Sequence, residues 1–209
     1  MAFDLQEQEQ LDALKAFWSR WGKWIAGAVA GLALAYAGYQ GWQYYEKQQS
    51  SAAAAVFSQV EASLAKGDLA AVKGVQAKLA EAYPGSAYAS RAAFLAARAA
   101  FDKGDLAYAK QQLTWVTQHS DEAALKALAH LRLAAVQLDE KRFDAAIAEL
   151  NQEHPTSFDA LFLDLKGDVY VARGDAKSAR DAYKAALAKL AGESPNRQFI
   201  QTKLDALGG

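Results

Sequence analysis

The chain has 209 residues, no cysteine and a formal net charge of −1, from 23 basic and 24 acidic side chains. Without cysteine it forms no disulfide, thiolate nucleophile, cysteine-ligated metal centre or cysteine-linked lipid anchor. The balanced charge shows no basic stripe, so we expect no nucleic-acid partner. Many alanines and only three prolines favour an all-α fold, because alanine loses no side-chain entropy in a helix.

Residues 1–23 are predicted to form a short cytoplasmic amphipathic segment. Its apolar residues recur at helical spacing and therefore share one face of a helix. They are Leu11, Leu14, Trp18 and Trp21. We expect this face to lie against a membrane surface, and a docking helix for a cytoplasmic partner is the alternative.

Residues 24–45 contain no charged side chain and are predicted to cross the lipid bilayer as one helix. A helix of this length spans ~33 Å, against about 30 Å of hydrocarbon. Tryptophan and tyrosine cluster at both ends, as at membrane interfaces, although alanine and glycine make the segment only moderately hydrophobic. Two alternatives stay open: a buried helix of a soluble domain, and a signal peptide cleaved within the small-residue run 52–55.

The basic residues that flank this segment predict its orientation. Lys15, Arg20 and Lys23 precede it, whereas only Lys47 follows before Lys66. Basic residues favour the cytoplasmic side. We therefore expect a single-pass protein of the bacterial inner membrane, with the N-terminus in the cytoplasm and residues 46–209 in the periplasm.

The uncharged segment also contains small residues at a spacing of four. Gly27, Gly31 and Ala35 share one helix face, and small residues there allow two membrane helices to approach closely. The spacing predicts a site of helix packing within the membrane.

Residues 46–209 contain a repeated turn, which predicts a tetratricopeptide-like α-solenoid of about four helical hairpins. Aligning the turns places Gly67, Gly104, Lys141 and Gly174 at equivalent positions, with spacings of 37, 37 and 33 residues. Such periods are typical of stacked helix pairs. The copies are LAKGDLAAVK at 64–73, FDKGDLAYAK at 101–110, the divergent LDEKRFDAAI at 138–147, and VARGDAKSAR at 171–180.

The Gly-Asp turns have residues suited to ending one helix and starting the next. Gly104 can adopt the left-handed conformation that ends a helix, and Asp105 can cap the following one. Small residues recur where paired helices would touch, among them Ala97, Ala134 and Gly167. Ser194-Pro195 predicts the start of a final helix, which would cover the open end of the solenoid.

The sequence contains no pattern that indicates catalysis. Its three histidines, at 119, 130 and 154, match no metal-binding spacing, and no phosphate-binding loop or nucleophile motif is present. We predict no enzymatic activity, no cofactor, no metal and no small-molecule substrate.

A concave face formed by the first helices of the hairpins is the candidate binding site. Mixed apolar and charged residues on such a face suit an extended or helical peptide. Alternatively, these residues only pack against neighbouring helices. The predicted groove residues are Phe57, Arg91, Phe94, Arg98, Phe101, Leu131, Asp164 and Asp168.

Taken together, the order of these features resembles the YfgM-type family of ancillary SecYEG translocon subunits. The resemblance covers nearly the whole chain, and the stretches that carry it are EQEQLDALKAFWSRWGK, the uncharged segment, LKGDVYVARGDAKSARDAYKAAL and the closing KLDAL. It implies a protein anchored in the inner membrane with a periplasmic tetratricopeptide-like domain.

The resemblance also implies partners. These are the SecYEG translocon, a membrane-anchored periplasmic chaperone similar to a prolyl isomerase, and newly translocated proteins that are still unfolded. A membrane-anchored scaffold for envelope or cell-wall assembly, self-associating through Gly27 and Gly31, is the alternative.

Overall fold

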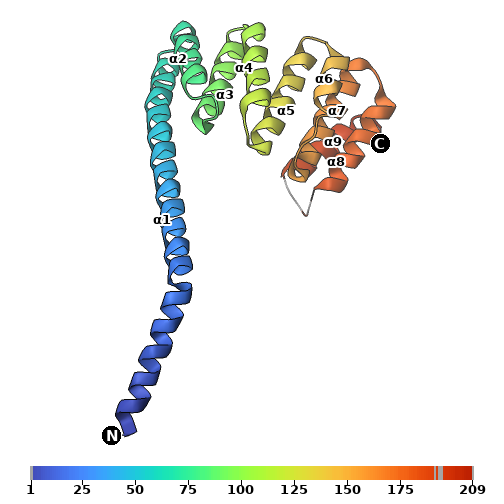
Figure 1. Ribbon diagram of the computed structural model, residues 1–209. Helices are drawn as coiled ribbons and strands as arrows, with labels where there is room; N and C mark the ends of the chain where they lie inside the picture. The colour runs from blue at the N-terminus through green and yellow to red at the C-terminus, as the bar shows by residue number, and fades with distance from the viewer. Residues whose placement is uncertain (1, 191, 193–194, 209) are drawn as a thin grey trace. The chain divides into compact units, whose positions relative to one another are not determined.

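The computed structural model describes the backbone of residues 2–190, 192 and 195–208, and side chains within these ranges from residue 9 onward. These ranges contain helices and turns and no strand. The chain divides into two compact units, Met1–Gln49 and Ser50–Gly209. The first helix, α1, extends from Ala2 to Ala65, so its last residues belong to the second unit (Figure 1).

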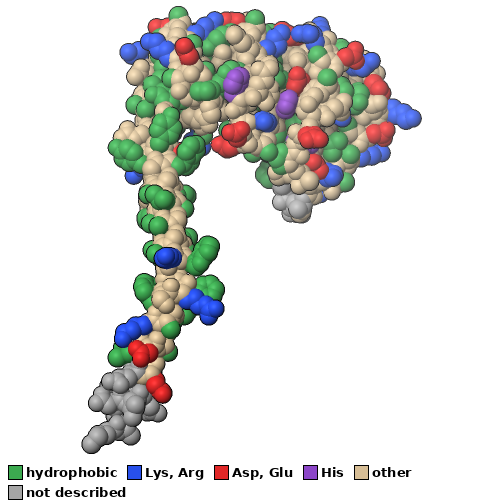
Figure 2. Space-filling model, viewed as in Figure 1, with side chains coloured by type: hydrophobic (Ala, Val, Ile, Leu, Met, Phe, Trp, Pro, Cys, Tyr) green, Lys and Arg blue, Asp and Glu red, His purple; other side chains and the backbone are tan. Residues whose placement is uncertain are grey.

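In the first unit, α1 exposes many large hydrophobic side chains (Figure 2). They include the four residues of the predicted amphipathic face, and Trp24, Trp42, Tyr44 and Tyr45 at the two ends of the uncharged segment. Four glutamines of this unit donate hydrogen bonds to tyrosine hydroxyls one turn earlier, as Gln40 does to Tyr36 at 2.8 Å and Gln49 to Tyr45 at 3.0 Å.

In the part of the chain that the structure describes, no helix combines the length and mean hydropathy of a membrane-crossing segment. The structure therefore does not show the membrane span that the sequence predicts for residues 24–45.

The second unit is a row of antiparallel helix pairs (Figure 1). The end of α1 pairs with α2 (Leu69–Ala82), and α3 (Ala87–Asp102) pairs with α4 (Leu106–His119). Next come α5 (Ala123–Asp139) with the short α6 (Phe143–Glu149), then the 3₁₀ turn η1 (Thr156–Phe158). The last pair is α7 (Asp159–Arg173) and α8 (Ala176–Lys189), and α9 (Pro195–Asp205) packs on α8.

This arrangement confirms the predicted all-α, tetratricopeptide-like solenoid, with its four hairpins and a final covering helix. Helix α9 begins at Pro195, as the sequence predicts. Its proposed cap, Ser194, lies outside the described residues.

The repeated turns have the predicted chemistry. Gly104 has a positive φ of 79°, and the Asp105 carboxylate accepts a hydrogen bond from the Tyr108 backbone N–H at 3.1 Å. Gly67 with Asp68 and Gly174 with Asp175 repeat this geometry. The divergent turn has Lys141 at φ 60° and Arg142 at the cap position, where no side chain caps α6.

Ion pairs join neighbouring hairpins at these turns. Lys73 of α2 pairs with Asp105 at 2.5 Å, and Lys110 of α4 pairs with Glu140 at 2.6 Å. The hydrogen bond from Lys73, followed by that from the Tyr108 N–H, holds the pKa of Asp105 below its usual value. The cap of one hairpin is thereby tied to the helix of the preceding one.

The paired helices α7 and α8 come into close contact at Gly167. A Cβ atom at this position would lie 2.3 Å from the Tyr183 ring, so only glycine fits the observed packing. Tyr183 is itself almost fully buried, and its hydroxyl donates to Asp168 at 2.7 Å. The predicted small residue at this helix contact therefore has a steric cause.

Replacing Gly167 with alanine should lower the free energy of unfolding by about 1–3 kcal/mol, because the added methyl group must displace the Tyr183 ring. Urea denaturation of the purified protein measures the change. Gly74→Ala is the matched control, since Gly74 also lies within a helix but has open space around it. The Gly74→Ala substitution should raise the free energy of unfolding by about 0.5–1 kcal/mol. Equal effects of the two substitutions would contradict the steric explanation.

Replacing Arg142 with asparagine should raise the free energy of unfolding by about 1 kcal/mol, because it supplies the missing cap of α6. The backbone angles already suit a cap: φ −90° and ψ 66° at Arg142 match φ −83° and ψ 69° at Asp105. Asparagine avoids adding negative charge beside Glu140 and Asp144. Arg142→Ala is the control for loss of the arginine, and an asparagine variant no more stable than it would refute the capping argument.

Candidate protein-binding groove

The predicted groove residues all lie on the first helices of their hairpins. Phe57 is on α1, Leu131 is on α5, and Asp164 and Asp168 are on α7. The remaining four lie on α3, and they are Arg91, Phe94, Arg98 and Phe101.

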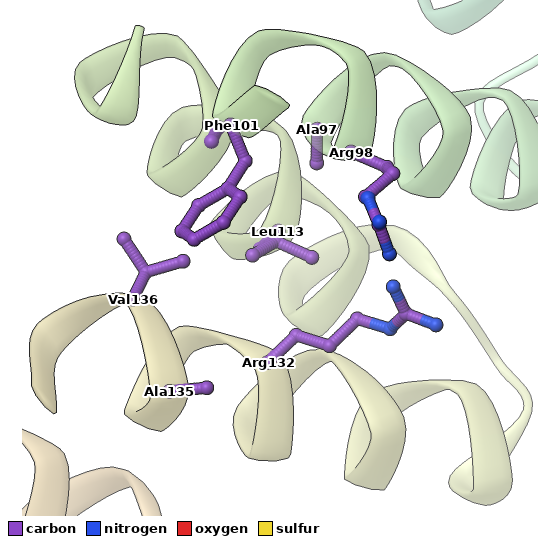
Figure 3. Close-up of a pocket in the computed structure, with 8 residues that line it drawn as sticks. Ala97, Arg98, Phe101, Leu113, Arg132, Ala135 and Val136 are labelled. Carbon is purple, nitrogen blue, oxygen red and sulfur yellow. The ribbon is translucent and has the colours of Figure 1, made fainter. Parts of the chain in front are cut away.

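Two of them, Arg98 and Phe101, line a cavity of about 270 Å³ between α3 and α5, with α4 behind it (Figure 3). We call this the α3–α5 cavity. Its other lining residues are Ala97 on α3, Ala109 and Leu113 on α4, and Arg132, Ala135 and Val136 on α5.

The wall of the α3–α5 cavity is apolar over most of its area. Leu113 and Val136 are buried, at 2% and 5% exposure, whereas Phe101 is 37% exposed. The alanines are small enough to leave space between the helices. An apolar side chain entering the cavity would lose contact with water, which favours binding.

Two arginines form one side of the cavity. Figure 3 shows the guanidinium groups of Arg98 from α3 and Arg132 from α5 extending toward one another. Arg98 uses its Nε to donate to Asp102, at 2.9 and 3.0 Å. Among the described residues, Arg132 has no acidic partner, and its guanidinium lies 5.6 Å from the centroid of the Phe94 ring. Donors for an incoming carboxylate are therefore available.

A second hollow adjoins Arg98 on its other side. This α2–α3 cavity has a volume of about 300 Å³ and is lined by apolar residues that include Leu64, Leu69 and Leu95. Arg98, Asp102 and Lys103 contribute its charged groups. Because Arg98 lines both cavities, the two hollows form neighbouring parts of one surface on α3.

The other apolar residues predicted for the groove pack mainly within the domain. Phe57 contacts the Tyr88 ring, with centroids 5.6 Å apart, and Phe94 is half-buried beside the α3–α4 core. Leu131 packs against the core of the third hairpin. Arg91 is exposed, and its guanidinium lies 6.0 Å from the Tyr88 ring centroid.

Asp164 and Asp168 are engaged by the final helix. The Lys203 ammonium of α9 lies 2.9 Å from Asp164 and 2.8 Å from Asp168. Burial raises the pKa of Asp164, an effect that Lys203 only partly offsets. Burial lowers the pKa of Lys203, but its bonds to both carboxylates outweigh this and leave it raised. These carboxylates therefore help α9 to close the solenoid.

The residues predicted to pack in the membrane are all exposed on α1. A Cβ atom on Gly27 or Gly31 would meet nothing within 4 Å, and Ala35 is exposed as well. No described side chain of this chain covers that face.

The histidines take part in local contacts. His130 bonds to Glu149 at 2.7 Å, and His154 stacks on Phe162 and lies 3.4 Å from Asp159. Within the described ranges, no three histidine or acidic side chains are grouped so that they could hold a metal ion. The contacts of His130 and His154 therefore support the packing of the helices and indicate no metal site among the described residues.

Sequence reasoning missed Arg132, Leu113 and Val136. The repeat alignment pairs Phe94 with Leu131, and it therefore pointed to the residue before Arg132. A signal was present, because Arg132 is the one lysine or arginine between Lys126 and Lys141 and interrupts the apolar run from Leu131 to Val136 of α5. No comparable sequence feature indicates that Leu113, on the second helix of its hairpin, lines the cavity.

Comparisons with known proteins agree with this architecture. A family model described as a tetratricopeptide repeat-like domain matches residues 15–209. No solved structure matches the chain.

Curated relatives extend over the full length. A protein of Neisseria gonorrhoeae named "Ancillary SecYEG translocon subunit" is 36% identical over 99% of this chain and 100% of its own. A protein of the same name from Haemophilus influenzae is 29% identical, with 99% and 100% covered. One from Escherichia coli is 41% identical over 66 residues, 32% of each chain. The chain therefore belongs to the family of these ancillary SecYEG translocon subunits and carries its tetratricopeptide repeat-like domain.

Proposed function

We propose that this protein is a membrane-anchored, non-enzymatic binding partner of the Sec translocon. The observation that carries the proposal is the full-length similarity to relatives named as ancillary SecYEG translocon subunits. The solenoid supports it, because its first helices present an apolar surface with available arginines. Such surfaces suit binding to peptide segments of other proteins.

The proposed anchor is residues 24–45, with residues 1–23 in the cytoplasm and residues 46–209 in the periplasm. Exposed Trp24, Trp42, Tyr44 and Tyr45 support it, because such rings favour the two interfaces of a bilayer. The mean hydropathy of α1 falls short of that of a typical span. Direct measurement of topology is therefore the decisive test of the anchor.

An anchored solenoid would act near the exit of the translocon. Tethering raises the effective concentration of a binding surface near its target without requiring tight contact. We propose that the groove engages a membrane-anchored periplasmic chaperone, or newly translocated proteins before they fold. Both kinds of partner would present extended segments to the first helices.

Crosslinking should detect these partners. A photo-reactive amino acid in place of Phe101, which lines the cavity and is partly exposed, should capture translocon or chaperone subunits in intact cells. The matched control places the same amino acid at Lys184, an exposed position of α8. Crosslinks should be several-fold stronger from position 101, and mass spectrometry identifies them. Absence of translocon and chaperone subunits from both positions would argue against the proposed function.

The absence of cysteine allows a clean topology test. Single-cysteine variants Ser19→Cys and Ser58→Cys place a thiol before and after the proposed anchor. In intact spheroplasts, a membrane-impermeant maleimide should label the Ser58→Cys variant and leave the Ser19→Cys variant unlabelled. After lysis, it should label both variants.

Two results would contradict the proposed anchor. One is equal labelling of both variants in intact spheroplasts. The other is release of the full-length protein from membranes by alkaline carbonate. A Leu32→Arg variant serves as a positive control for weakened insertion, because arginine at the centre of a span costs about 2.5–3.5 kcal/mol.

A further inference from the structure

We infer that the α3–α5 cavity binds a partner segment in which a carboxylate lies beside a large apolar side chain. The inference rests on the proposed function, that is, on binding of protein segments, and it specifies the chemistry of the ligand. The cavity would take the apolar side chain, and the two arginines would take the carboxylate.

The charge of the arginine pair favours a carboxylate as ligand. Arg98 and Arg132 come from different hairpins and extend toward one another (Figure 3), although like charges repel at short range. Asp102 engages only the Nε of Arg98, and no described acidic side chain pairs with Arg132. A carboxylate between the guanidinium groups would accept hydrogen bonds from both, and arginine presents its donors in a fork that matches a carboxylate.

The size and lining of the cavity favour a single apolar side chain. Its volume of about 270 Å³ lies just below the ~300–1,000 Å³ typical of small-molecule sites. Leu113, Val136 and the ring of Phe101 form an apolar wall beside the charged groups. A space of this size suits one large side chain of a peptide.

Arg98 lines both the α3–α5 cavity and the α2–α3 cavity. A segment lying across α3 could place a second apolar side chain against Leu64, Leu69 and Leu95 in the α2–α3 cavity. The carboxylate would then lie near Arg98, between two apolar contacts. The expected ligand is therefore an acidic peptide with apolar residues close to the acid, rather than a uniformly acidic one.

Fluorescence anisotropy with the full-length protein in detergent micelles tests this inference. The probe is a labelled ten-residue peptide with Phe-Asp-Leu between glycine and serine residues, and the matched peptide has asparagine in place of aspartate. The aspartate peptide should bind about tenfold more tightly, because hydrogen bonds to charged groups are the stronger ones.

Substitution of the arginines should remove this preference. Arg98→Gln and Arg132→Gln should each weaken binding of the aspartate peptide about tenfold and leave the asparagine peptide nearly unaffected. Arg142→Gln is the matched control, because this exposed arginine lies in the turn before α6, outside the cavity. It should leave both affinities unchanged.

Three results with the peptides would overturn the inference. They are equal binding of the two peptides, unchanged affinity in both cavity variants, and no binding of the aspartate peptide up to about 1 mM. Phosphatidylglycerol vesicles should bind the wild-type and cavity-variant proteins equally. Loss of vesicle binding in the cavity variants, without discrimination between the peptides, would assign the arginines to lipid and overturn it too.

Crosslinking separates this inference from the proposed function. If the wild-type protein crosslinks to translocon subunits but does not discriminate between the peptides, the ligand chemistry is wrong and the proposed function stands. If it discriminates between the peptides but crosslinks to no translocon or chaperone subunit, the proposed function is wrong and the cavity's chemistry stands.

Discussion

Close packing of alanine-rich helix faces is the interaction on which the solenoid depends. A single helix pair leaves apolar faces exposed, and only its neighbours can cover them. Every buried residue of α3 is alanine except Ser90, so adjoining helices can approach its backbone. At Gly167 even a methyl group is excluded, because the Tyr183 ring occupies its place. The size of the residues at these contacts therefore sets the spacing of the helices.

The same small residues explain why a cavity forms where it does. Helix α5 packs against α7, but between α3 and α5 the facing residues include Ala97 and Ala135. Neither is large enough to fill the space, and Ala109 on α4 adds no bulk behind them. Small residues on the helix faces thus explain both the tight packing within a hairpin and the open space between two hairpins.

Ion pairs at the turns align neighbouring hairpins and contribute little to the free energy of unfolding. Lys73 and Asp105 are each about one-third exposed, and pairs exposed to solvent contribute only ~0–1 kcal/mol. However, Asp105 also caps α4, so its carboxylate links the start of one hairpin to a helix of the preceding one. The Lys110–Glu140 pair repeats the link at the divergent turn, where the cap itself is missing.

The turns and hairpins could be predicted from sequence because local chemistry determines them. Gly104 and Asp105 act through their own backbone angles and neighbouring N–H groups, which sequence spacing specifies. The residues of the candidate groove were harder to predict. Each residue advances about 100° around a helix, so an alignment error of one residue assigns a side chain to a different face. Leu131 and Arg132 are adjacent, yet the first packs in the core and the second lines the cavity. The pairing of Asp164 with Lys203 depends on where α9 folds back, which no local pattern specifies.

The proposed binding surface at the arginine pair differs in character from the packing around it. Elsewhere in the solenoid, cations such as Lys73, Lys110 and Lys203 are neutralised by acids on a neighbouring element. Arg132 lies over the ring of Phe94 with no described acid as its partner, and Arg98 keeps its terminal nitrogens free of described acceptors. An acid from within the domain at this point would relieve the repulsion, but it would also occupy the position that an incoming carboxylate needs. In the proposed binding mode, a partner supplies the acid that the two guanidinium groups lack among the described residues, so part of the electrostatic stabilisation is gained only on binding.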